Sequence, residues 1–157
     1  MKPTAVHVPK KAGIWIDQEK AYIFLMVGNS EPVMHKIKSE VESKQLHLSG
    51  QNEDKSRSAN YIAGERDKKQ HRQEHERSDF FKEVMRQVMD ADYIYIFGPG
   101  PARHGLINTL QEEKQLKGSI LPSEKAGRMT LNQMRAKVEE YFTPEHLKKT
   151  VHPSFHN

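Results

Sequence analysis

The residues with the clearest chemical potential follow a short apolar run at positions 93–97. There the chain reads Gly98-Pro99-Gly100-Pro101, and Arg103 and His104 come next. This order predicts a buried strand, a tight loop and a helix, and such loops commonly bind anions with backbone N–H groups and a helix N-terminus. We therefore predict an anion- or RNA-binding site at Gly98, Gly100, Arg103 and His104. The open alternative is a stiff reversal that binds no ligand, because the two prolines lack N–H donors.

A second group of cations lies on a charge-rich segment that begins near position 67. Lys68, Lys69 and Arg72 lie close together there, and we predict that they contact RNA phosphates. Acidic residues alternate with the bases in this region, so a mixed, solvated helix face is the alternative interpretation. His71 and His75 are four residues apart, but Arg72 occupies the position where a zinc protease carries its acid. We predict no metal site and no cofactor.

Asp17 is a third candidate, because it ends the first strand-like run of the chain. Two-metal nucleases use a carboxylate at such a position, and they need further acids around the same cations. The position that follows the apolar run at 93–97 carries glycine and proline in place of a second acid. Asp17 is thus the one residue of such a set that the sequence offers, and it is a candidate for nucleic-acid hydrolysis on that basis alone. The alternative is an aspartate that bonds the neighbouring backbone in a turn.

Five runs have the length and composition of strands, and three longer runs have helical spacing. We expect strands at residues 13–17, 21–27, 33–38, 93–97 and 118–122. We expect helices at residues 67–90 and 101–115, and a last helix that Thr130 caps. Short connections make the first three strands an antiparallel meander, and alternating helices and strands follow. The predicted fold class is α/β, with a mixed five-stranded sheet of the ribonuclease H-like kind.

The length of 157 residues suits one domain with a real core and is too short for two. We expect a single α/β domain over residues 12–142, a flexible leader at 1–11 and a peripheral tail at 143–157. Apolar residues become sparse between positions 40 and 66, which predicts a long mobile loop.

The composition narrows the choice of partner and compartment. A formal charge of +4 and a pI near 9.2 suit a polyanion such as RNA. The absence of cysteine excludes disulfides and thiol catalysis. No stretch has the pattern of a signal peptide or a membrane span, so we expect a cytoplasmic protein with no membrane partner. The oligomeric state is not predicted by these patterns.

Three stretches carry a resemblance to a known family. They are Gly13-Ile14-Trp15-Ile16-Asp17, the change from polar to apolar residues at 79–84, and the segment 96–103. Together they resemble the middle domain of the eukaryotic and archaeal class-I peptide release factor and of its ribosome-rescue relative Pelota, and more closely small bacterial relatives of that domain. The resemblance covers roughly residues 13–142. It implies the ribonuclease H-like fold of translational machinery components and a role in translation.

The same resemblance makes Gln51 a candidate catalytic residue. In release factors a Gly-Gly-Gln tip promotes hydrolysis of peptidyl-tRNA, and Ser49-Gly50-Gln51 occupies the comparable loop here. Pelota-like middle domains lack the tripeptide, and likeness to them implies binding or rescue without hydrolysis. We therefore expect a translation-associated module that contacts ribosomal or transfer RNA without catalysis. Two alternatives stay open: a small hydrolase that uses Gln51 on peptidyl-tRNA or Asp17 on nucleic acid, and a protein-interaction domain.

Overall fold

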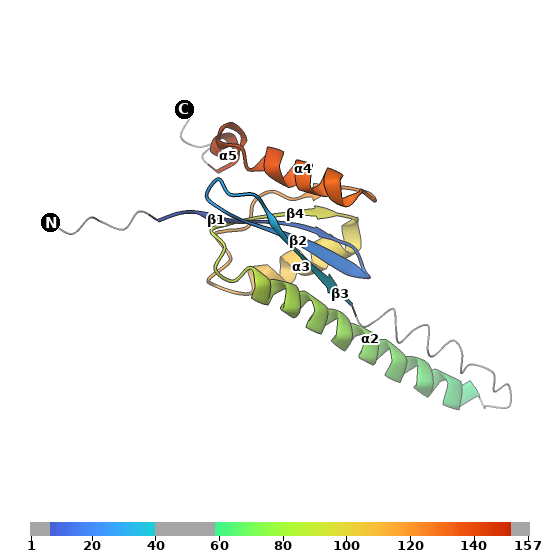
Figure 1. Ribbon diagram of the computed structural model, residues 1–157. Coiled ribbons are helices and arrows are strands. Elements are labelled where there is room, and N and C mark those ends of the chain that lie inside the picture. The colour runs from blue at the N-terminus through green and yellow to red at the C-terminus, as the bar shows by residue number, and fades with distance from the viewer. Residues whose placement is uncertain (1–6, 40–58, 152–157) are drawn as a thin grey trace.

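The computed structural model describes residues 7–39 and 59–151, which form a mixed five-stranded sheet with helices on both faces (Figure 1). The strands are β1 (Lys10–Ile16), β2 (Lys20–Val27), β3 (Val33–Lys38), β4 (Tyr93–Gly98) and β5 (Glu124–Lys125). They lie in the order β3-β2-β1-β4-β5. β1, β2 and β3 form an antiparallel meander, whereas β4 is parallel to β1, and β5 is parallel to β4. The fold class predicted from the sequence is confirmed.

The two central strands, β1 and β4, are apolar on both sides. Ile14 pairs with Ile96, and Trp15 pairs with Phe97. Because successive side chains of a strand point to opposite faces, the two isoleucines share one face and the two aromatic rings share the other. All four side chains are buried, which is the pattern of strands that are covered by helices on both faces.

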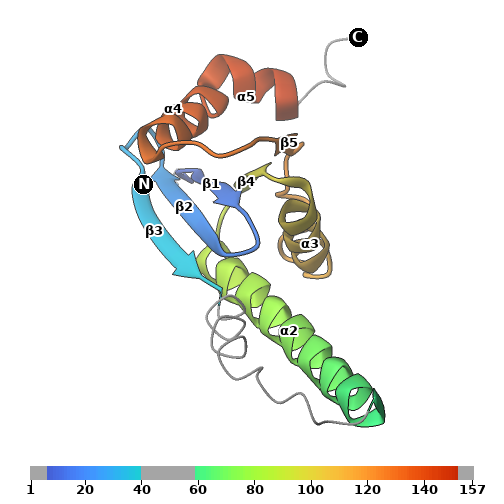
Figure 2. The ribbon, with the colours of Figure 1, turned by 90° about the vertical axis from the view of Figure 1, so that its right-hand side faces the viewer.

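The helices are α2 (Ala59–Gln87), α3 (Gly100–Gln111), α4 (Leu131–Tyr141) and α5 (Pro144–Val151). α2 and α3 cover one face of the sheet, and α4 and α5 cover the other (Figures 1 and 2). As predicted, Thr130 caps α4, because its side chain accepts a hydrogen bond from the Gln133 N–H at 3.1 Å. Of the helices in the described ranges, none combines the length and apolar character of a membrane span.

α2 is longer than the sequence pattern predicts. It begins at Ala59 and not near position 67, and it ends at Gln87 and not at position 90. Residues 59–66 contain no proline, so their mixed composition does not prevent a helix. The predicted mobile loop at 40–66 therefore ends in helical residues, and its remaining part at 40–58, which includes Gln51, lies outside the described residues.

The fifth strand also differs from its prediction at residues 118–122. From that range, only Ile120 forms a bridge, to Ile94 of β4, and β5 itself comprises Glu124 and Lys125. Pro122 lies between the two pairings and has no N–H to donate to a ladder. The sheet edge at β5 is consequently short.

The sheet divides the core into two clusters of different composition. The cluster beneath α2 and α3 is aliphatic apart from Phe80 and Phe81, and we call this side the aliphatic face. On the side of α4 and α5, which we call the aromatic face, the buried rings are Trp15, Phe24, Tyr95, Phe97, Tyr141 and Phe142.

Candidate functional site

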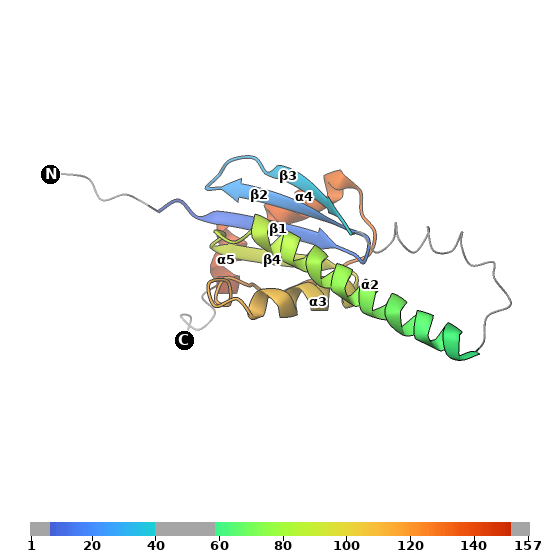
Figure 3. The same cartoon turned by 90° about the horizontal axis from the view of Figure 1, so that it is seen from below.

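The carboxyl ends of β1 and β4 lie at one edge of the sheet, because the two strands are parallel. Residues from the β1–β2 turn, from the start of α3 and from the middle of α2 line a common hollow there. α2 continues past this edge (Figures 1 and 3). Ligands of open α/β sheets commonly bind outside the carboxyl ends of the strands. We call this part of the molecule the carboxyl edge.

Gly98 ends β4 and allows the chain to pass very close to β1. Its φ is +137°, and a Cβ atom would lie 2.3 Å from the carbonyl oxygen of Ile16. No other residue fits both the conformation and the space. Gly100 differs, because a Cβ there would meet only the Cδ2 atom of His104, at 3.9 Å. The packing of β4 against β1 therefore explains Gly98, whereas the space around Gly100 is open.

The start of α3 offers backbone donors at the carboxyl edge. Pro99 is the N-cap residue and makes no side-chain cap, and the Arg103 N–H donates to the Pro99 carbonyl at 3.3 Å. Pro101 has no N–H. The N–H groups of Gly100 and Ala102 belong to the first turn, where a helix provides no acceptor. These groups and the positive end of the helix dipole face the loop.

Arg103 and His104 are held differently. The Nη1 atom of Arg103 donates to the Ser123 hydroxyl at 2.7 Å, which fixes the guanidinium beside the segment that precedes β5. The Nε atom of Arg103 is buried and has no hydrogen-bond partner among the described residues. His104 is exposed. The start of α3 thus carries one guanidinium that is bonded to Ser123 and one exposed imidazole.

Lys68, Lys69 and Arg72 belong to the first half of α2, and α2 extends past the sheet at that end (Figure 2). Lys68 and Arg72 are exposed, and Lys69 is half-buried. None of the three forms an ion pair within the described ranges. These cations and the loop before α3 lie at the same end of the molecule, but on separate elements.

The hollow between α2 and α3 was not predicted from the sequence. Its volume is about 130 Å³, and its lining consists of Gln18, Arg77, Phe80, Phe81, Pro101, Ala102 and Gly105. A larger hollow, of about 500 Å³, runs along α2 and is lined by Lys69, Gln70, Gln73, Glu74 and Arg77. Arg77 belongs to both. The available sequence signal was its position, where α2 changes from polar to apolar just before Phe80.

Asp17 has the contacts of a turn residue. Its Oδ1 atom accepts hydrogen bonds from the N–H groups of Glu19 and Lys20, both at 2.8 Å. Its Oδ2 atom lies 3.7 Å from Nζ of Lys20. Within the described ranges, no three His, Cys, Asp or Glu side chains are grouped closely enough to hold a metal ion. The structure thus shows the backbone contacts that the turn interpretation of Asp17 predicts.

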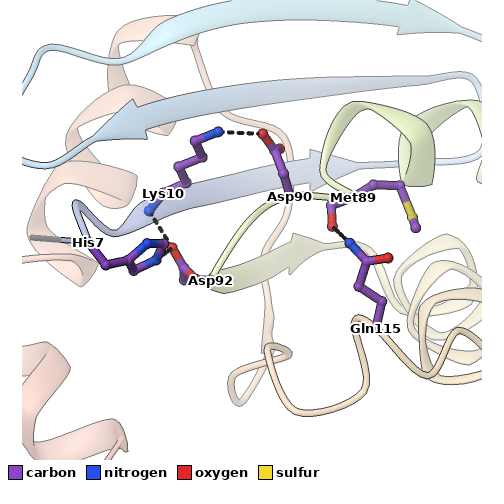
Figure 4. Close-up of polar contacts among 6 residues, drawn as sticks. All are labelled: His7, Lys10, Met89, Asp90, Asp92 and Gln115. Carbon is purple, nitrogen blue, oxygen red and sulfur yellow. Dashed lines mark hydrogen bonds and ion pairs between the residues drawn. The ribbon is translucent and has the colours of Figure 1, made fainter. Parts of the chain in front are cut away.

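At the opposite edge of the sheet, where β1 and β4 begin, a polar cluster ties β1 to the turn after α2 (Figure 4). Asp92 Oδ2 accepts a hydrogen bond from the Lys10 N–H at 2.8 Å and contacts His7 Nε2 at 2.8 Å. Lys10 Nζ donates to Asp90 Oδ2 at 2.7 Å. The bond from the Lys10 N–H lowers the pKa of Asp92, and the bond from the Lys10 side chain lowers the pKa of Asp90. Sequence patterns did not indicate this cluster, because each of its contacts joins residues that are 80 or more positions apart.

Comparisons with known proteins identify the fold. No protein-family model and no curated protein matches the sequence. The structure is similar to that of the Pelota protein from Thermoplasma acidophilum, with 17% identity and a TM-score of 0.51, over 92% of this chain and 35% of that one. It is also similar to an archaeal translation termination factor, aRF1, with 13% identity and a TM-score of 0.51, over 87% of this chain and 36% of that one.

The chain therefore spans about a third of the length of these two solved structures. At such low identities the similarity shows a shared fold. The fold that the family resemblance implied is confirmed.

Proposed function

We propose that the protein is a translation-associated binding module that contacts ribosomal or transfer RNA and does not catalyse a reaction. The proposed contact surface combines the α2 cations with the loop before α3, namely Lys68, Lys69, Arg72, Gly98, Gly100, Arg103 and His104. The observation that carries the proposal is the placement of cations, which form no ion pair with any described residue, on a helix that extends past the carboxyl edge.

The shared fold supports the link to translation. aRF1 is a translation termination factor, and this fold occupies about a third of its chain. A module of this kind would work where ribosomes lie, in the cytoplasm. In this proposal the chain brings the cationic helix and loop to RNA.

The charge distribution supports RNA over a neutral protein partner. The chain has a formal net charge of +4, and exposed Lys68 and Arg72 have no acidic partner in the described part of the chain. Cations in such positions bind phosphates mainly by releasing counterions, so the affinity falls steeply as salt rises. The contacts of Asp17 support binding over hydrolysis, because its carboxylate is engaged by the turn and by Lys20.

Co-sedimentation with ribosomes and direct binding to tRNA, each at low and high salt, test the proposal. Reversing two charges in the Lys68→Glu, Lys69→Glu variant should weaken binding about tenfold or more at low salt and reduce the salt dependence. The matched control is Lys114→Glu, Lys117→Glu, which makes the same charge change at exposed positions beyond the end of α3. Equal losses in both variants, or binding that does not respond to salt, would contradict the proposed surface.

A further inference from the structure

Arg77 connects two hollows of different character at the carboxyl edge. The larger hollow follows the polar part of α2 from Lys69 to Arg77. The smaller one begins at Arg77 and continues between α2 and α3. Arg77 is half-buried and forms no ion pair within the described ranges. We call the part of α2 that lines the larger hollow the cationic strip, and we call the smaller hollow the recess. The two meet at the guanidinium of Arg77.

The recess has an apolar floor and a polar rim. Phe80, Phe81 and Ala102 are buried beneath it, and the exposed Pro101 forms part of its wall. Gln18, an exposed residue of the β1–β2 turn, supplies an amide at the rim opposite α2. At about 130 Å³ the recess is well below the roughly 300–1,000 Å³ of pockets for drug-sized ligands, so it suits a single small group.

We propose that this recess holds one unpaired base of an RNA strand whose phosphates follow the cationic part of α2. The inference rests on the proposed function and deepens it, because it assigns a base subsite to a surface so far described only by its charge. Proteins recognise unpaired RNA bases by contact with apolar and aromatic side chains, by stacking on arginine and by hydrogen bonds to base edges. Phe80, Arg77 and Gln18 are the side chains that meet these three requirements here.

Charge favours a base over an aromatic side chain of a protein partner. A base arrives with a phosphate on each side, and the rim offers Arg77, with Lys69 farther along α2. Glu74 also lines the larger hollow, so the strip is cationic on balance and not uniformly basic. An apolar side chain of a protein would bring no anion to pair with Arg77.

The test compares two short single-stranded RNAs that differ at one central position. One carries a fluorescent purine analogue there, and the other lacks the base but keeps the sugar and phosphates. The protein should bind the base-containing RNA about tenfold more tightly, and the fluorescence should change as the analogue leaves the solvent. Arg77→Ala and Gln18→Ala should reduce this preference. Lys82→Ala, an exposed change on α2 outside both hollows, should preserve it.

The outcomes separate the base subsite from the proposed function. Equal affinity for the two RNAs, with binding still weakened by Lys68→Glu, Lys69→Glu, would overturn the base subsite and leave RNA contact intact. A preference that survives both Arg77→Ala and Gln18→Ala would place the base elsewhere and would also overturn the assignment. Failure to bind either RNA at low salt would overturn the base subsite, whereas co-sedimentation with ribosomes and binding to tRNA decide the proposed function. Insertion of a tryptophan-containing peptide into the recess, without any base preference, would assign it to a protein partner.

Discussion

The two faces of the sheet are held by different means, although the same strands supply both. The aliphatic face packs against α2 and α3 through apolar side chains that contain no polar atoms. The aromatic face carries polar groups into the core: Trp15 Nε1 donates to the Gly127 carbonyl at 3.0 Å, and the Tyr141 hydroxyl donates to the Pro122 carbonyl at 3.2 Å. Tyr95 stacks on Tyr141 with ring centroids 3.6 Å apart.

The two faces therefore have different structural roles. Hydrogen bonds and stacked rings specify one position of α4 and of the segment before it, because few other arrangements satisfy buried polar atoms. The aliphatic face packs against α2 through apolar side chains, and α2 is the helix that carries the candidate RNA contacts. The faces should therefore respond differently to changes in packing and in pH.

The largest effect is expected where α4 lies closest to the sheet. A Cβ atom at Gly13 would lie 2.4 Å from Cγ2 and 2.7 Å from Cγ1 of Val138. Valine in a helix has one strongly preferred rotamer, so α4 must move, and Gly13→Ala should cost about 3 kcal/mol in the free energy of unfolding. Urea denaturation measures this loss. Adding Val138→Ala should recover part of it, and strictly additive losses would show that the two sites do not touch.

The corresponding change on the aliphatic face should cost less. A Cβ atom at Gly105 would lie 2.6 Å from Cε2 of Phe81, so Gly105→Ala pushes α3 away from α2. Alanine also favours the helix by about 1 kcal/mol relative to glycine, which offsets part of the clash and leaves a net loss near 1 kcal/mol. Gly118→Ala is the control, because no atom lies within 4 Å of its added Cβ. If Gly105→Ala lowered the free energy of unfolding as much as Gly13→Ala does, the predicted difference between the faces would be wrong.

Removing one hydroxyl should stabilise the aromatic face. Tyr95 is fully buried, and its hydroxyl lies near the Glu124 carboxylate but makes no hydrogen bond of ordinary geometry with any described residue. Tyr95→Phe removes this unsatisfied group and keeps the ring, so thermal or urea unfolding should show a gain of about 1 kcal/mol. A loss of stability would mean that the hydroxyl is satisfied in solution.

The smallest expected effect is a difference between the two faces in how the free energy of unfolding changes at alkaline pH. Burial, followed by the nearby Glu124 carboxylate, raises the pKa of Tyr141 to about 12, and the same causes in the same order raise the pKa of Tyr95. The unfolded chain loses these protons near pH 10, before the folded chain does. Their contribution to stability is therefore complete below about pH 10 and is lost as pH rises through the folded pKa values.

The measurement is the free energy of unfolding as a function of pH. Tyr141→Phe and Tyr95→Phe should each flatten the alkaline decline. Val84→Ala, a cavity-forming change on the aliphatic face, should lower the whole curve without changing its slope. A change of slope in Val84→Ala would show that the faces are coupled.

Sequence patterns predicted the parts of the fold that depend on local order. The short apolar runs at residues 13–17 and 93–97 indicated strands, and helical spacing together with the change from polar to apolar residues at 79–84 indicated α2. The pattern was wrong about the start of α2 and the extent of the fifth strand. Residues 59–66 are helical despite their mixed composition, and the single bridge at Ile120 depends on how the chain returns to β4.

The candidate site was predicted only in part, for a similar reason. Gly98 through His104 are contiguous, so they were visible as one motif. Arg77 and Gln18 are 59 positions apart and meet only because α2 crosses beneath β1 and β2 on its way to β4. The Lys10–Asp90 pair depends in the same way on the parallel pairing of β1 with β4. A sequence pattern within one segment cannot show which distant residues of the chain lie close together in the fold.

The buried apolar side chains that α2 contributes among its described residues all lie in its second half. Among the residues whose side chains the structure describes, Phe80 and Phe81 are the first apolar side chains of α2 to enter the core. Both rings also line the recess beside Arg77. A substitution that shifts these rings would therefore change the stability of the fold and the shape of the recess together.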